Sequence, residues 1–323
     1  ASPYAYSQQI DFQKSWIAVN TGEGAVTGLD MIKLGKGAIH APWVRIHNPK
    51  LSVFRDKRLP FPENHYPPML HKALAEAQIP VSIDTVELSD AQIKVNIQPP
   101  KGERVASIQF TNTEAYLTNV TNLPEEIKVN HLLNVQAYAQ IQDAGLLKAQ
   151  LDFDLSHPGY PFFIEAELGS MDLRKLNTLT EPIASVRIKK GRMRRMTFRA
   201  LANEDFAYGN MDFMYRGLNI QMLSKKDHEH HGVGLAVESF LANRLILRKN
   251  NDYPFPHRQG QLFVERDATR SIFNYLAKIS LNGILSSAGI KSNRKALYQQ
   301  YQHRKEQLVE SQKENINTTT STQ

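Results

Sequence analysis

The sequence predicts a mainly β protein, in which an extended, curved antiparallel meander sheet forms a groove-like body and a C-terminal amphipathic α-helix follows it. Two observations carry this prediction. Apolar and polar residues alternate through most of residues 8–223, as half-buried strands require. Past residue 267 the apolar residues take helical spacing instead. We therefore expect a β-rich domain over residues 1–266, a helix over 267–290 and a polar, partly disordered tail over 291–323.

The clearest alternation lies in residues 160–223. The turn-forming pieces between its strands are Gly169-Ser170, residues 172–182 and Lys190-Gly191. One face of each strand is apolar, so we expect that face to line the groove. The predicted lining residues are Phe162, Ile164, Leu168, Val186, Ile188, Phe198, Phe206 and Tyr208.

A run of basic residues without any acid occupies residues 187–199. Its members are Arg187, Lys189, Lys190, Arg192, Arg194, Arg195 and Arg199. They alternate with apolar residues, and an extra bulge residue at Arg195 would return Met196 and Phe198 to the apolar face. This pattern is typical of a solvated strand face. Two alternatives stay open, which are binding of a polyanion and binding of an anionic membrane surface.

The N-terminal part contains shorter alternating strands. Val44 and Ile46 precede Asn48-Pro49, and further apolar residues alternate after it, which predicts two strands around a tight corner. The proline-rich residues 59–68 cannot continue a strand, and a short helical turn follows them. This places a sub-boundary of the domain near residues 59–78. Strands resume from residue 79 to 156.

A loose unit recurs along the chain, consisting of a short β-branched strand, a turn residue and a longer strand. Its three copies are WVRIHNPKLSVFR, VSIDTVELSDAQIKVNI and SVRIKKGRMRRMTFR. The turn residue is Asn, Asp or Gly. This recurrence indicates a sheet that has been extended unit by unit.

The predicted C-terminal helix begins at a cap formed by Asp267 or Thr269 and ends at Gly289. Its apolar face is predicted to consist of Ile272, Phe273, Leu276, Ile279 and Ile284. Such a face needs an apolar surface. We expect it to pack on the end of the sheet with Phe273 buried; the alternative is a helix that lies on a membrane or gates the groove. Residues 235–251 predict a further helix that runs into a strand.

Composition and motifs argue against an enzyme. The chain of 323 residues has 41% hydrophobic residues, a net charge of +7 and no cysteine, which excludes disulfides, thiolate nucleophiles and cysteine-ligated zinc. It holds no run of 18 apolar residues and no nucleotide-binding, hydrolase or zinc-protease motif. His228, His230 and His231 form the one histidine cluster, and we interpret it as a polar loop. We therefore expect no catalytic residue, no cofactor and no metal site.

Four segments carry a resemblance to a known family. They are ASIQFTNTEAYLTNVTN, the turn DLRKLN paired with ASVRIKKGRM, FAYGNMDFMYRGLNIQML and VERDATRSIFNYLAKISLNGILSSAGI. Together they resemble the C-terminal region of AsmA-like bacterial envelope proteins, especially Bacteroidetes forms, over roughly residues 40–290. The resemblance implies an N-terminal anchor helix in the inner membrane, which we expect this chain to have lost, and a periplasmic β-rich groove that serves outer-membrane biogenesis and lipid transport.

Two hypotheses for function follow. The first is a non-enzymatic envelope protein that offers an apolar β-groove to phospholipid or other acyl lipid, in lipid transfer or membrane lipid homeostasis. A sheet with one apolar face must bury that face, and acyl chains are a suitable cover, since each buried methylene gains about 0.8 kcal/mol. The alternative is a structural module of the envelope, with a closed core and a protein partner. We expect no nucleic-acid partner.

Overall fold

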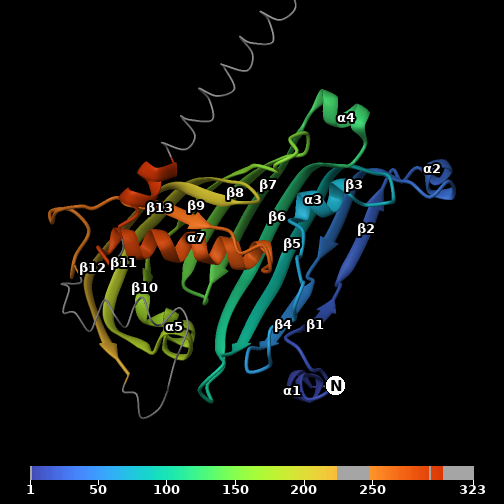
Figure 1. Ribbon diagram of the computed structural model, residues 1–323. Helices are drawn as coiled ribbons and strands as arrows, with labels where there is room; N and C mark the ends of the chain where they lie inside the picture. The colour runs from blue at the N-terminus through green and yellow to red at the C-terminus, as the bar shows by residue number, and fades with distance from the viewer. Residues whose placement is uncertain (1, 224–247, 291, 301–323) are drawn as a thin grey trace, which may run out of the picture.

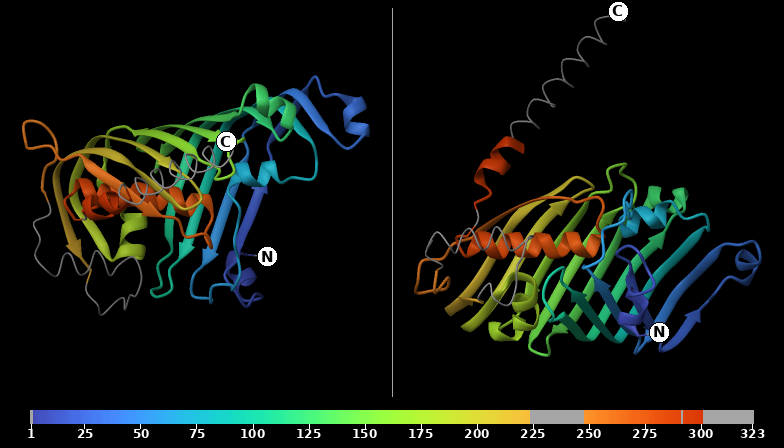
Figure 2. Two further views of the ribbon diagram at one scale, coloured as in Figure 1. Left: turned by 45° about the horizontal axis from the view of Figure 1, so that its top comes forward. Right: turned by 60° about the horizontal axis from the view of Figure 1, so that its bottom comes forward.

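The computed structural model of the chain describes residues 2–223, 248–290 and 292–300. Thirteen strands in these residues form one large, open and mostly antiparallel sheet, which confirms the mainly β prediction. Figure 1 shows the strands following one another across the sheet, and Figure 2 shows the sheet curving around helix α7. The predicted helix-strand segment 235–251 lies outside the described residues except for its last four positions, and the predicted disordered end of the tail lies outside them as well.

The strands are β1 (Ser15–Asn20), β2 (Glu23–Thr27), β3 (Ile39–His47), β4 (Lys50–Asp56), β5 (Val81–Gln98), β6 (Ala106–Thr121), β7 (Leu132–Ile141), β8 (Gly145–Asp154), β9 (Phe162–Leu168), β10 (Met171–Asp172), β11 (Val186–Ala202), β12 (Phe206–Met222) and β13 (Gly260–Glu265). The helices are α1 (Pro3–Ser7), α2 (Met31–Gly35), α3 (Leu70–Ala75), α4 (Pro124–Val129), the 3₁₀ helix η1 (Leu173–Leu176), α5 (Asn177–Ala184) and α7 (Ile272–Ser287). One sheet therefore extends from residue 15 to 265, and β4 and β5, on either side of the predicted sub-boundary, are neighbours in it.

The Asn48-Pro49 junction does not reverse the chain. Strand β3 pairs with the first half of β5 and β4 with the second half, both in parallel orientation. The predicted tight corner is therefore wrong, because β3 and β4 continue along the same edge of β5. Proline is tolerated at this junction because the neighbouring groups keep the ladder: Asn48 N donates to Ser89 O at 2.8 Å, and Pro49 O accepts from Gln92 N at 2.9 Å.

Residues with positive φ lie at corresponding places between β1 and β2, between β3 and β4, within β5 and within β6. We call this set the bulge line; it consists of Gly22, Asn48, Asp90 and Asn112, with φ of 63°, 51°, 54° and 47°. Glycine is required at the first position, because a Cβ there would lie 2.0 Å from His47 O. Each bulge bends its strand, and the bends lie at adjacent places in neighbouring strands. Asn48 and Asp90, the turn residues of two copies of the recurrent sequence unit, thus form bulges and do not reverse the chain.

The two faces of the sheet differ in polarity, and the register identifies them. Residues directly opposite each other in paired strands lie on one face. One such row runs through ten strands and consists of Val26, Val44, Val86, Leu117, Val135, Leu151, Ile164, Ala200, Gly209 and Leu262. We call this side the inner face, because α7 packs against its last strands. The intervening residues of β5, β6 and β7 on the outer face are mostly polar.

Residues 172–182, predicted as a turn, form η1 and α5 instead. Asp172 begins η1 by accepting a hydrogen bond from Arg174 N at 2.9 Å. Helix α5 packs against both β6 and β11, which are not neighbours in the sheet. Strands β7, β8 and β9, which lie between them, are shorter than β6 and β11. Helix α5 fills the space beyond the ends of these three strands. Local sequence signals a turn here, but the gap in the sheet favours a helix.

The connection between β4 and β5 crosses to the far part of the inner face. Met69 and His71 are fully buried there. His71 stacks on Phe153 with 4.7 Å between ring centroids, and its Nε2 donates to Tyr160 O at 2.9 Å. Burial lowers the pKa of His71, so its ring is neutral at pH 7. Residues 57–80 are therefore a packed crossing and not a flexible linker.

Helix α7 begins after Ser271, and its buried side differs from the predicted one. Ile272 and Ile279 are buried as predicted, and Leu276 and Ile284 pack at the edge of the core. Phe273, however, is 67% exposed, whereas Tyr275 is buried. The helix starts at Ile272, later than predicted, and its orientation turns Phe273 away from the sheet. Asp267 does not cap the helix; it accepts hydrogen bonds from Thr269.

Side chains of α7 close the edge of β13. Asn282 accepts from Phe263 N at 3.3 Å and donates to Phe263 O at 2.9 Å. Gln261 is bound in the same manner: its N–H donates to Ser286 Oγ, and its C=O accepts from Asn293. The groups that a further strand would use are thus occupied. The helix reaches them because Gly260 and Gly283 have no side chain; a Cβ on Gly283 would lie 2.6 Å from Leu262 and Met211.

The orientation of α7 can be tested by truncating two side chains of similar hydrophobicity. Ile279→Ala should destabilise the protein by about 2 to 5 kcal/mol, because it leaves a cavity in the core. Phe273→Ala should cost less than about 1 kcal/mol, since this ring is mostly exposed. Urea unfolding of both variants measures the two values. A larger loss for Phe273→Ala would contradict the orientation.

The closed edge can be tested with Asn282→Ala. This change leaves the N–H and C=O of Phe263 without partners, so we expect a loss of about 2 kcal/mol and a greater tendency to aggregate. Ser280→Ala is the matched control, because this hydroxyl bonds only to Leu276 O in its own helix. Thermal unfolding with light scattering gives both readouts. Equal behaviour of the two variants would show that the edge needs no closure.

Candidate functional site

The residues predicted to line a groove divide between the two faces. Six of them are buried in the core of the inner face: Phe162, Ile164, Leu168, Val186, Ile188 and Phe198. Phe206 and Tyr208 lie on the outer face, where their rings are 6.1 Å apart and Phe263 stacks on Phe206. The strand β12 buries Ala207 and Met211 instead. Alternation fixes which residues share a face, but it does not tell which face is inside.

A different part of the inner face remains open. We call it the open apolar face; its residues come from β1, β4, β5 and β6 and form two cross-strand rows. The first row is Val19, Leu51, Ile93 and Phe110, and the second is Ile17, Val53, Val95 and Ile108. All eight side chains are aliphatic or aromatic. Phe110 pairs with Ile141 of the core, so the open apolar face continues the core toward the β1 edge.

Exposure rises along these rows from the core to the edge. Phe110 and Ile108 are half-buried and pack against the core, whereas Ile17 and Val19 are 59% and 61% exposed. Helix α7 packs on β12 and β13. Helix α1 lies on the outer face, where Tyr4 contacts Phe54 with 4.9 Å between rings. Among the described residues, none of these helices covers the two rows.

The sequence carried part of this signal. Leu51 and Val53 alternate on one side of the bulge line, and Ile108 and Phe110 do so in β6. Ile17 and Val19 show the same alternation in the short segment SWIAVN. The strand pattern was therefore readable. Which strands lie under a helix and which stay open depends on where α7 docks, and no local pattern specifies that.

The basic run of β11 lies on the outer face, and most of its arginines have acidic partners. The register jumps between Met193 and Arg195, so the predicted bulge is present near this position. The ion pairs are Arg187 with Glu181, Arg194 with Asp252, Arg195 with Glu167 and Arg199 with Glu165. Four of the seven cations of the run thus contact an acid of a neighbouring element. This arrangement fits a solvated strand face.

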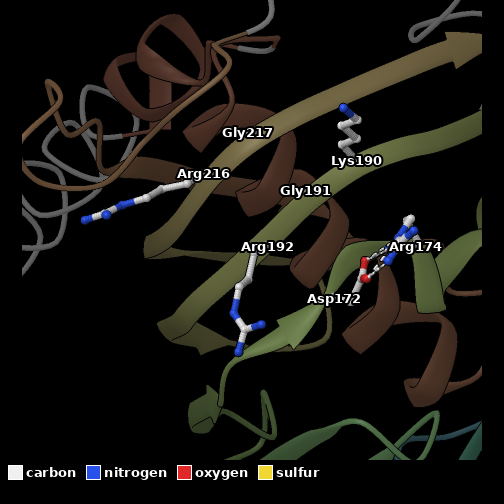
Figure 3. Close-up of a pocket in the computed structure, with 7 residues that line it drawn as sticks. All are labelled: Asp172, Arg174, Lys190, Gly191, Arg192, Arg216 and Gly217. Atoms are coloured by element: carbon white, nitrogen blue, oxygen red, sulfur yellow. Dashed lines mark hydrogen bonds and ion pairs between the residues drawn. The ribbon is translucent and has the colours of Figure 1, made fainter.

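A shallow pocket of about 430 Å³ lies beside this run, between β10, β11 and β12. Arg174, Lys190, Arg192 and Arg216 line it, but their side chains diverge, as Figure 3 shows. Arg174 is bonded to Asp172, and Arg216 to Asp252 and to Tyr253 O. Two of the four cations are therefore already engaged and do not converge on one point. This geometry does not form an anion site.

Other kinds of site have little support in this chain. The described residues contain no cluster of metal-ligating side chains, and His228, His230 and His231 lie outside them. No helix in the described part of the chain has the length and apolar character needed to span a bilayer. No protein-family model matches the chain, and neither a curated protein nor a solved structure matches it. The open apolar face is thus the strongest candidate.

Pairing of the outer arginines leads to a prediction about polyanions. The wild-type protein should not retard a short DNA duplex or a single-stranded RNA in a gel shift at low salt, because the arginines are engaged by acids. The double change Glu165→Gln and Glu167→Gln frees Arg199 and Arg195 and serves as the positive comparison. Strong, salt-sensitive binding by the wild type would contradict a merely solvated face.

Proposed function

We propose that this chain is a non-enzymatic lipid-binding module whose open apolar face shelters the acyl chains of phospholipid or another acyl lipid. The single observation that carries this proposal is the pair of apolar rows on β1, β4, β5 and β6, with Ile17 and Val19 exposed at its edge. The other six side chains are half-buried, and a contiguous apolar surface that stays partly accessible supports a binding role. The sheet is curved, as Figure 2 shows, so the strands beside an alkyl chain on the inner face would reduce its contact with water.

The energetics favour an alkyl ligand. Each methylene removed from water contributes about 0.8 kcal/mol, so a chain of about ten methylenes gains several kcal/mol even when partly sheltered. The rows offer no polar side chain, and therefore recognition along the chain is by shape and hydrophobicity. Such a site tolerates many acyl chains. This low selectivity suits lipid transfer or the maintenance of membrane lipid balance.

The resemblance to AsmA-like envelope proteins supports the same proposal. It adds the cell envelope as the location, with the periplasm as the compartment and a membrane anchor in the full-length protein. The absence of cysteine is compatible with that compartment. An open sheet with one apolar face is the architecture that the resemblance implies.

The test combines lipid analysis with two substitutions on one strand. Protein purified from cells should carry phospholipid on extraction and native mass spectrometry, and it should bind a fluorescent fatty acid. Val95→Asp should weaken this binding at least about tenfold, because it places a charge beside the alkyl chain. Asn96→Asp is the control, since this position pairs with Phe54 and Ser107 on the outer face. Circular dichroism checks that both variants fold.

Two outcomes would contradict the proposal. One is the absence of both co-purifying lipid and fatty-acid binding in the wild type. The other is an equal effect of Val95→Asp and Asn96→Asp on binding, with both variants folded. Either result would remove the open apolar face from consideration as a lipid site.

A structural module with a protein partner is the second candidate, and the edge of β1 favours it. In the described residues β1 pairs only with β4, so its other edge has free hydrogen-bonding groups. Its sequence SWIAVN contains neither proline nor a charged residue, which are the usual protections of an edge. A partner strand could bind there by sheet extension. Native mass spectrometry distinguishes the candidates, since this one predicts a protein adduct without lipid.

A further inference from the structure

Four cations lie near enough to affect one another on the inner face, at one end of the open apolar face. They are Arg55 of β4, Lys57 after it, Arg270 before α7 and Lys278 within α7. Arg55 lies two positions beyond Val53 on β4, on the same face and next to the apolar rows. Its partners in the neighbouring strands are Ile97 and Ser15. Loop residue Phe61 contacts this group, with the Arg270 guanidinium carbon 3.7 Å from its ring centroid.

Acidic partners for this cluster are few. Asp267 lies 3.6 Å from both Arg270 Nε and Lys278 Nζ and is shared between them. Arg55 Nε donates to the uncharged Ser15 Oγ at 3.1 Å. Lys57 has no ion pair within the part of the chain that the structure describes. In the outer basic run, by contrast, four of the five arginines contact an acid.

The cations also act on one another. Burial and the nearby charges of Arg270, Arg55 and Lys278 lower the pKa of Lys57. Burial and the nearby charge of Arg270 lower the pKa of Arg55 as well. The folded protein therefore holds positive charges together at a cost to its own stability. An anionic group placed between these cations would lessen their repulsion, and the adjoining apolar rows would receive a chain attached to it.

We infer that the cluster of Arg55, Lys57, Arg270 and Lys278 binds the phosphate head of an anionic amphiphile whose alkyl chain lies on the open apolar face. This inference rests on the proposed function and names its substrate class. Guanidinium groups present forked donors that match phosphate oxygens, and ammonium groups add point charge. The head binds where the rows end at Arg55, and the chain runs from there past Val53 and Val95.

Three probes separate the head from the chain. They are dodecyl phosphate, dodecyl maltoside with the same chain and an uncharged head, and inorganic phosphate, with both amphiphiles used below their micelle concentrations. Isothermal titration of the full chain should give at least about tenfold tighter binding of dodecyl phosphate than of dodecyl maltoside. Inorganic phosphate alone should bind weakly, because it lacks the chain. The double change Lys57→Met and Arg270→Met should remove the preference and leave dodecyl maltoside unchanged.

A second readout excludes a merely structural role. Without ligand, Lys57→Met should raise the melting temperature, because it removes one of several mutually repelling charges. The same variant should lose the stabilisation that dodecyl phosphate gives the wild type. Lys94→Met is the control, since this lysine lies on the outer face of the neighbouring strand and is exposed. If Lys57 were needed for folding, Lys57→Met would lower the melting temperature of the free protein.

The outcomes are distinct. If neither amphiphile binds, the proposed function fails along with this inference. If both bind equally and the double variant changes nothing, only this inference is overturned. Binding of inorganic phosphate as tight as that of dodecyl phosphate would also overturn it, since the site would then serve a free anion and not a lipid head. A lower melting temperature for Lys57→Met would contradict the repulsion on which the inference depends.

Discussion

Side chains of α7 occupy the hydrogen-bonding positions that another strand would take beside β13. Asn282 and Ser286 satisfy the outer backbone groups of Phe263 and Gln261, and Gly283 allows the close approach. The same helix buries Ile279 and Tyr275 on the inner face. One element thus closes an edge and covers a face at the C-terminal end. Because the helix packs on β12 and β13, it leaves the N-terminal strands with an open edge and an open face.

This asymmetry organises the functional candidates. The inner rows run from a covered core under α7 to exposed positions at Ile17 and Val19, without a change in residue character. The cation cluster stands at the transition, since Arg270 and Lys278 belong to the region of α7, and Arg55 belongs to the open strands. An amphiphile placed there would contact both parts. The outer basic run lies on the opposite face of the sheet, and four of its seven cations contact acids of neighbouring elements.

The sequence predicted the strands well because alternation is a local property that burial of one face enforces. It predicted the recurrent unit but interpreted Asn48 and Asp90 as turns, since the same residue types favour positive φ in turns and in bulges. Phe206, Tyr208 and Phe273 were assigned to the wrong side, because the docking of an element decides its inner side. The open apolar face and the cation cluster join segments distant in sequence, so no local pattern could reveal them.

The bulge line has a consequence for how such a sheet can vary. Gly22, Asn48, Asp90 and Asn112 bend the strands through their backbone conformation, whereas the contacts available to a ligand come from other positions, such as Ile93 and Val53. Curvature and lining are therefore specified by separate residues. Substitutions in one set can change the width of the concavity while the other set keeps its chemistry. A scaffold built in this way can be adapted to ligands of different girth without losing its affinity for hydrocarbon.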